Sequence, residues 1–332
     1  MNSGTPVPRA PSRAPALLRL AFAAALVCYF FARANPGAVL QAFTRISGGP
    51  LVVVVGLVLV DRALMAYRWF VLLRPLERER MPSFGVVLDI FFVSTFLGTF
   101  LPGSIGGDAV RAYSLSKHGV PIGDSTASVF VDRMLGVLAL LVVALVSVAL
   151  ARDLASERAI VVGLGMTATV CAAAALLVFS NRTEAVAESL LARLPRESIR
   201  RVPAQILASI RRYAQHRGAL IHVLAASVAV QILRVLQAYY LGVAMGLPHS
   251  LQVYFAFVPL ILLIMLLPIT VNGLGTSQAA FMWLFGRVQT PAPEAFVLSV
   301  LFVGLQIVGN FPGALLVLVK TGRDVGVRGP QH

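Results

Sequence analysis

Seven charged residues interrupt the apolar runs of this 332-residue sequence, at positions where a lipid-facing charge is costly. They are Asp61, Arg62, Arg68, Asp89, Asp132, Arg133 and Arg234. At the centre of a bilayer each would cost about 2.5–3.5 kcal/mol, so we expect each to face protein or a polar cavity. Arginine in such a place can bind phosphate or carboxylate groups, and a carboxylate there can carry protons. Structural ion pairs between helices are the alternative for each residue.

Two pairs of these charges are adjacent in sequence, Asp61–Arg62 and Asp132–Arg133. Neighbouring residues on a helix point about 100° apart. We therefore expect the two members of each pair to contact different partners. The candidate proton carriers are Asp61, Asp89 and Asp132.

Proline and glycine interrupt two further apolar runs. Segments 101–108 (LPGSIGGD) and 267–275 (LPITVNGLG) both follow a short apolar stretch, and their prolines lie 166 residues apart. Proline ends a helix and glycine allows a sharp turn, so a new helix starts with unpaired N–H groups that suit phosphate or carboxylate. Ordinary kinks in two spans are the alternative. The candidate substrate-binding residues are Pro102, Gly103, Ser104, Gly106, Gly107, Asp108, Arg111, Pro268, Asn272, Gly273, Gly275, Ser277 and Gln278.

A phosphate group is expected at the helix starts after Gly107 and Gly275. Arg111 lies three positions after Asp108, and it is expected either to pair with that aspartate or to reach a headgroup phosphate. Besides Arg111, one further arginine is expected to bind the phosphate, namely Arg62, Arg133 or Arg234.

The elements that must position these residues are transmembrane helices. Apolar residues make up 58% of the chain and charged residues 13%, with a mean hydropathy of +0.84, which excludes a soluble enzyme domain, a disordered chain and a coiled coil. The predicted fold is an all-α polytopic transmembrane helical bundle, with six full spans plus two broken or re-entrant helix pairs that form an inverted repeat. Whether the short segments re-enter or span stays open. The expected full spans are 16–31, 48–73, 125–150, 160–179, 219–245 and 295–319, and the broken elements are 86–101, 251–267 and 275–285.

The distribution of basic residues among the loops predicts which side of the membrane each loop faces. On the re-entrant arrangement the loops on the N-terminal side carry 19 basic residues and the opposite loops five, which predicts cytoplasmic termini. We expect a cytoplasmic tail at 1–15, one transmembrane domain over 16–320 and a second tail at 321–332. The first apolar run also has signal-peptide features, but an uncleaved helix is preferred.

The loop 181–218 carries eight arginines. Its apolar residues Ile206, Leu207, Ile210 and Tyr213 share one helical face, which predicts a basic interfacial helix on anionic lipid. A solvated cytoplasmic loop is the alternative.

Several kinds of chemistry have no support in the sequence. The two cysteines and five histidines show no metal-ligand spacing, and no nucleotide-binding motif or catalytic motif is present. We therefore expect no metal, no cofactor, no nucleic-acid partner and no enzymatic activity.

Four segments resemble signatures of one known family. Segments 68–75 (RWFVLLRP), 100–113 (FLPGSIGGDAVRAY), 131–136 (VDRMLG) and 267–281 are similar to those of the lysylphosphatidylglycerol synthase transmembrane family, also called flippase-like. The resemblance implies a multi-pass protein of the bacterial cytoplasmic (inner) membrane. Its relatives include the flippase half of multiple peptide resistance factors, which moves aminoacylated phosphatidylglycerol between leaflets, and proteins that accompany glycosyltransferases or hopanoid biosynthesis. Many members carry Arg-Glu where this chain has Ser277-Gln278.

The leading hypothesis is a lipid transporter of flippase type that moves a phospholipid or lipid-linked headgroup between leaflets, through a polar cavity between the two broken helices. Its partners would be membrane lipids, either an anionic phospholipid or a polyprenyl- or hopanoid-linked lipid. One alternative is a non-catalytic membrane partner of a glycosyltransferase or lipid-synthesis enzyme. Another is a lipid-modifying enzyme using Asp89 and Asp108. A homodimer stays open.

Overall fold

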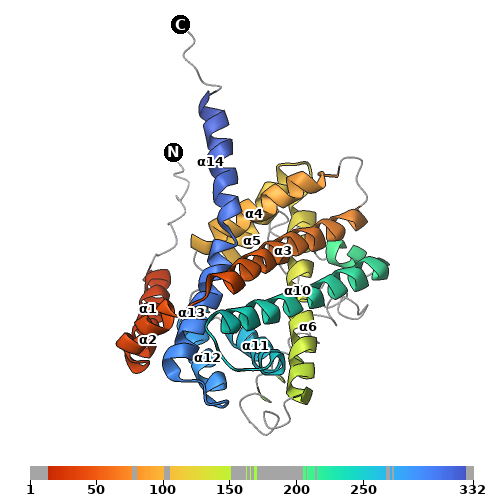
Figure 1. The fold of residues 1–332 in the computed structure, drawn as a ribbon. Coiled ribbons are helices and arrows are strands. Elements are labelled where there is room, and N and C mark those ends of the chain that lie inside the picture. The colour runs from red at the N-terminus through yellow and green to blue at the C-terminus, as the bar shows by residue number, and fades with distance from the viewer. Residues whose placement is uncertain are drawn as a thin grey trace, which may run out of the picture.

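Apolar runs form helices throughout the described part of the chain (Figure 1). The computed structural model describes residues 14–76, 81–100, 105–150, 162, 165, 168–169, 205–206, 208–213, 215–266, 270 and 273–326. Within these residues there is no strand. The helices are α1 (Ala14–Arg33), α2 (Pro36–Thr44), α3 (Gly48–Leu73), the 3-10 turn η1 (Arg74–Leu76), α4 (Phe84–Phe100), α5 (Ile105–Ser116), α6 (Ile122–Leu150), α10 (Arg217–Ala244), α11 (Leu251–Leu266), α12 (Thr276–Gly286), α13 (Ala292–Val308) and α14 (Phe311–Gly326).

Four stretches are long and apolar enough to cross a membrane, namely Gly48–Leu76, Ile122–Ala149, Arg217–Ala244 and Ala292–Leu318. They correspond to four of the six predicted full spans. Helix α1 covers the first predicted span, whereas 160–179 lies almost entirely outside the described residues. The all-helical, multi-pass membrane fold is therefore confirmed.

The last predicted span, 295–319, is long and apolar enough to cross the membrane, but two residues interrupt its helix. Helix α13 ends at Val308 and α14 begins at Phe311, with Gly309 and Asn310 between them. The proline at position 312 has no N–H, so it fits the first turn of a new helix. Gly309 also lies against Val58 of α3, where a Cβ atom would overlap the valine side chain.

Helices α3 and α10 form the centre of the bundle and run antiparallel (Figure 1). At one end the Ser47 backbone N–H donates to the Ala244 carbonyl at 2.8 Å, and at the other the Tyr67 hydroxyl lies 3.2 Å from His222 Nε2. Helix α6 packs against both. One hydrophobic core lies around α3–α6 and the start of α10, and a second around α10–α13.

The two predicted broken elements are helix pairs, α4 with α5 and α11 with α12. Their helices have 17, 12, 16 and 11 residues, each fewer than the roughly 20 that span a bilayer. Helices α4 and α5 approach closely, since a Cβ on Gly107 would lie 3.1 Å from Gly98 Cα. Before α12 the chain turns through Gly273 and Gly275, whose positive φ of 73° and 85° favours glycine.

The helical segment around 205–215 does not turn its apolar face to lipid, which corrects that expectation. Ile210 and Tyr213 are buried in the core formed by α3–α6. Ser209 donates a hydrogen bond to the Asp124 carboxylate, and Arg212 Nη2 lies 3.6 Å from the same group. Burial and the Asp124 charge both raise the pKa of Tyr213. This segment is thus docked on the start of α6.

Candidate functional site

The first group of buried charges, the Asp61 cluster, comprises Asp61, Arg62, Arg234, Gln306 and Asn310. Asp61 lies midway along α3 and is fully buried. Arg62 Nη1 donates to Asp61 Oδ2 at 2.8 Å, and Arg234 Nε from α10 lies 3.5 Å from Asp61 Oδ1. The prediction that Asp61 and Arg62 contact different partners was therefore wrong, because the long arginine side chain bends back to its neighbour.

Arg62 also caps the C-terminus of α13. Its Nε donates to Asn310 Oδ1 at 3.0 Å, and its Nη2 donates to the Gln306 carbonyl at 3.1 Å and to Gln306 Oε1 at 2.9 Å. The last carbonyls of a helix lack intrahelical partners and carry partial negative charge, so a guanidinium is favourable there. The break between α13 and α14 thus leaves the Gln306 carbonyl, which a continuous helix would use itself, to accept from Arg62.

Side-chain amides extend this cluster to two further helices. Gln306 Nε2 donates to Gln237 Oε1 on α10 at 2.8 Å, and Asn310 Nδ2 donates to Thr99 Oγ1 on α4 at 3.0 Å. The cluster therefore joins α3, α4, α10 and α13. Sequence reasoning missed Gln237, Gln306 and Asn310. Amides inside apolar runs, and the sequence GNFP at 309–312, were the available signals.

The second group, the Asp132 cluster, consists of Asp132 on α6, Arg68 on α3 and Arg111 on α5. Arg68 Nε lies 2.7 Å from Asp132 Oδ1, and Arg111 Nη1 lies 3.5 Å from Oδ2. The three side chains are at most 6% exposed. The Arg111 guanidinium also lies 5.2 Å from the centre of the Trp69 ring and 4.6 Å from that of Phe91, so two aromatic faces stabilise its charge.

Arg133 and Asp108 form an ion pair next to the Asp132 cluster. Arg133 Nε and Nη2 donate to the two Asp108 carboxylate oxygens at 2.8 and 2.9 Å, and the Arg133 side chain is half exposed. Asp132 and Arg133 thus contact different partners, as expected. Arg111 pairs with Asp132 and not with Asp108, so the expected pairing of Arg111 with Asp108 was wrong.

Each cluster contains two guanidinium groups around one carboxylate. In a region of low dielectric constant, an excess of positive charge within a cluster attracts an anion. The Asp61 cluster is the more accessible, because the Arg234 side chain is 21% exposed, whereas the side chains of the Asp132 cluster are at most 6% exposed. Asp89 on α4 is partly buried and belongs to neither cluster.

The N-terminus of α12 is capped by side chains of the helix itself. The Gly275 N–H donates to Gln278 Oε1 at 2.6 Å, and the Ser277 hydroxyl donates to the same oxygen at 3.1 Å. Ser277 and Gln278 are buried, and the Thr276 hydroxyl donates to the Gly273 carbonyl at 3.0 Å. A carboxamide oxygen therefore occupies the place where a bound anion was expected.

The start of α5 also differs from the prediction. The helix begins at Ile105, one residue before Gly106, so Gly107 lies within it and packs against α4. The remaining predicted residues lie outside the described part of the chain, namely Pro102, Gly103, Ser104, Pro268 and Asn272. Among the described residues, α4–α5 packs on α3, α6 and α14, and α11–α12 on α6, α10 and α13, without extensive packing between the two pairs.

A comparison of the sequence with models of known families identifies the family of this chain. The family model of the lysylphosphatidylglycerol synthase TM region matches residues 16–313. The chain belongs to this family. The match covers both hairpins and both clusters and ends at Gly313, where α14 packs against Phe92 of α4. A search of the curated proteins finds no match.

In the described residues of this family member, no three His, Cys, Asp or Glu side chains come close enough to hold a metal ion. The described interior contains guanidinium groups on α3, α5 and α10, grouped around two buried carboxylates.

Proposed function

We propose that the protein is a lipid transporter of flippase type, with both termini in the cytoplasm of a bacterial cell and without enzymatic activity. A phosphate-bearing headgroup would cross beside α3 and α10 while its acyl chains remain in lipid. Phospholipids and polyprenyl- or hopanoid-linked lipids are the proposed substrates. Membership of the flippase-like family and the arginine-rich interior support this proposal.

The observation that carries the proposal is the Asp61 cluster. It lies about 18–20 Å from either end of α3 at 1.5 Å per residue, so it sits near the middle of the span. Arg234 reaches this depth from α10, is partly exposed, and holds Asp61 only at 3.5 Å. A headgroup phosphate can take a bidentate contact from Arg234 as the headgroup passes the bilayer centre.

Passage also needs an opening, because Asp61 and Arg62 are buried in this conformation. The α13–α14 break offers a hinge, since the Gln306 carbonyl and the Asn310 side chain are held by Arg62. A phosphate that draws a guanidinium away from this end of α13 would loosen it. Helix α5 of one hairpin and α11 of the other both pack on α6, and the two hairpins of the proposed inverted repeat would move relative to each other.

Exchange of labelled lipids in proteoliposomes tests the proposal. Dithionite quenching of fluorescent phosphatidylglycerol, aminoacylated phosphatidylglycerol and a polyprenyl-phosphate lipid reports leaflet exchange. We expect Arg234→Gln to slow exchange at least about tenfold, the equivalent of one lost charge-assisted hydrogen bond. Arg234→Lys should retain part of the rate because it keeps the charge and loses the planar fork. Arg45→Gln, an exposed arginine before α3, is the matched control. Exchange equal to that of protein-free liposomes for every lipid would refute the proposal.

A further inference from the structure

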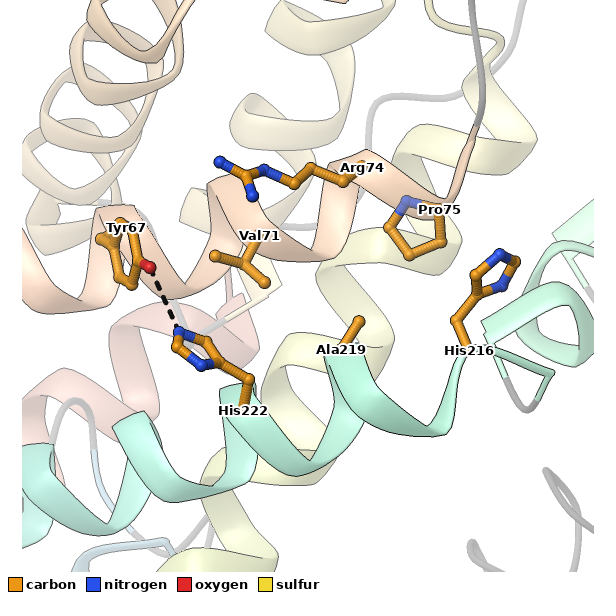
Figure 2. Close-up of a pocket in the computed structure, with 7 residues that line it drawn as sticks. All are labelled: Tyr67, Val71, Arg74, Pro75, His216, Ala219 and His222. Atoms are coloured by element: carbon orange, nitrogen blue, oxygen red, sulfur yellow. Dashed lines mark hydrogen bonds between the residues drawn. The ribbon is translucent and has the colours of Figure 1, made fainter.

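A pocket of about 380 Å³ lies where the end of α3 meets the start of α10, apart from both charge clusters (Figure 2). Its polar lining comes from Arg74, Tyr67, His216 and His222, and no carboxylate lines it. Val71, Pro75 and Ala219 provide its apolar wall. A guanidinium, a phenol and two imidazoles form a set of hydrogen-bond donors suited to an anion with several oxygens.

The cation in this pocket is available for a ligand. Arg74 is exposed, and among the described residues its neighbour is the Phe70 ring at 5.4 Å and no carboxylate pairs with it. His216 Nδ1 donates to the Arg212 carbonyl at 2.9 Å, which leaves Nε2 as the other ring nitrogen. His222 Nε2 lies 3.2 Å from the Tyr67 hydroxyl, and Figure 2 shows this contact across one side of the pocket.

The position of the pocket favours a ligand from the membrane. The stretch Gly48–Leu76 has 29 residues, so at 1.5 Å per residue it measures about 44 Å, against about 30 Å of hydrocarbon. Its last turns therefore reach the headgroup region. Arginine at this depth and an exposed tyrosine just below it are typical of a helix end at the membrane interface.

An apolar stripe leads along α3 to this pocket. Val53, Val60 and Tyr67 are exposed by 44%, 54% and 37%, and they are spaced seven residues apart, so they share one face. Arg74 continues the same spacing. On α10, Ile221, the neighbour of His222 in sequence, is 68% exposed. A hydrocarbon chain lying on this face places the group at its head against Arg74.

We propose that this pocket binds the phosphate group of a membrane phospholipid, whose acyl chain lies along Val53, Val60 and Tyr67. Arg74 donates N–H groups to the phosphate oxygens, and the Tyr67 and His222 pair closes the apolar side. The site is separate from both charge clusters, and binding there does not depend on leaflet exchange.

Native mass spectrometry of the full-length protein released from detergent micelles tests this site. The probes are dioleoylphosphatidylglycerol and the diacylglycerol with the same acyl chains. We expect the wild-type protein to retain the phospholipid in preference to the diacylglycerol. Arg74→Gln and His222→Ala should each lower the affinity for the phospholipid about tenfold, and Arg45→Gln should leave it unchanged.

A second variant separates loss of the pocket from loss of the fold. Ala219→Phe fills the pocket and keeps every polar lining residue, and it should also lower phospholipid binding while the protein keeps its melting temperature. Equal binding by wild type, Arg74→Gln and Ala219→Phe would overturn the proposal. So would equal retention of diacylglycerol, or displacement of the lipid by millimolar inorganic phosphate, which would assign the pocket to a free anion. A protein that binds here but exchanges no lipid would refute only the transport proposal.

Discussion

The Asp61 and Asp132 clusters have the same ratio of arginine to aspartate and opposite surroundings. Around Asp132 the partners are charges and rings, since Arg68 approaches to 2.7 Å and Arg111 is covered by Trp69 and Phe91. Around Asp61 the partners are amides and a helix end, and one arginine is partly exposed. Buried ion pairs covered by aromatic rings hold helices in place. Side-chain amides and an interrupted helix, in contrast, allow an arginine to exchange its hydrogen-bond partners. We infer that the Asp132 cluster fixes α3, α5 and α6, and that the Asp61 cluster is the one that can rearrange.

Removing each aspartate tests this difference most strongly. Asp132→Ala leaves Arg68 and Arg111 buried without their carboxylate, which should cost about 3–5 kcal/mol of folding free energy. Asp61→Ala should cost less, about 1–3 kcal/mol, because Arg62 keeps its acceptors on α13 and Arg234 is partly exposed. Thermal unfolding of both variants in detergent measures the difference. Asn at each position, which keeps the shape, is the control, and a larger loss for Asp61→Ala would reverse our assignment.

A smaller effect is expected at the helix break. Asn310→Leu removes the acceptor of Arg62 Nε and the donor to Thr99 at once, so it should cost about 1–3 kcal/mol of unfolding free energy. If this end of α13 is the hinge, the same variant should alter the rate of leaflet exchange more than a variant of equal stability near Asp132. Ser227→Ala, which removes a 2.9 Å contact to Arg68 Nη1, is that matched control. Equal exchange rates in the two variants would mean that the break is only structural.

How far the sequence predicts this molecule depends on whether a feature is local. Spans such as 48–73 and 219–245 were predicted closely, because the apolar composition that sets them is local. The pairing of Arg62 with Asp61 was not predicted, because the partner of a long, flexible side chain depends on its tertiary surroundings. The α13–α14 break depends on Val58 and Arg62 of a helix more than 200 residues away in sequence. At Gly107 the glycine was predicted to contact a ligand, and its contact is the backbone of α4.

The smallest expected effect concerns the start of α12, where the Gln278 side chain caps the helix. Gln278→Ala removes the acceptor of the Gly275 N–H and of the Ser277 hydroxyl, and loss of a helix cap costs about 1 kcal/mol. Gln278→Glu keeps an acceptor at the same place, and a carboxylate is favoured by the positive end of the helix, so it should lose less stability than the alanine variant. Thermal unfolding of the two variants measures this order. The reverse order would show that burying the charge outweighs the cap.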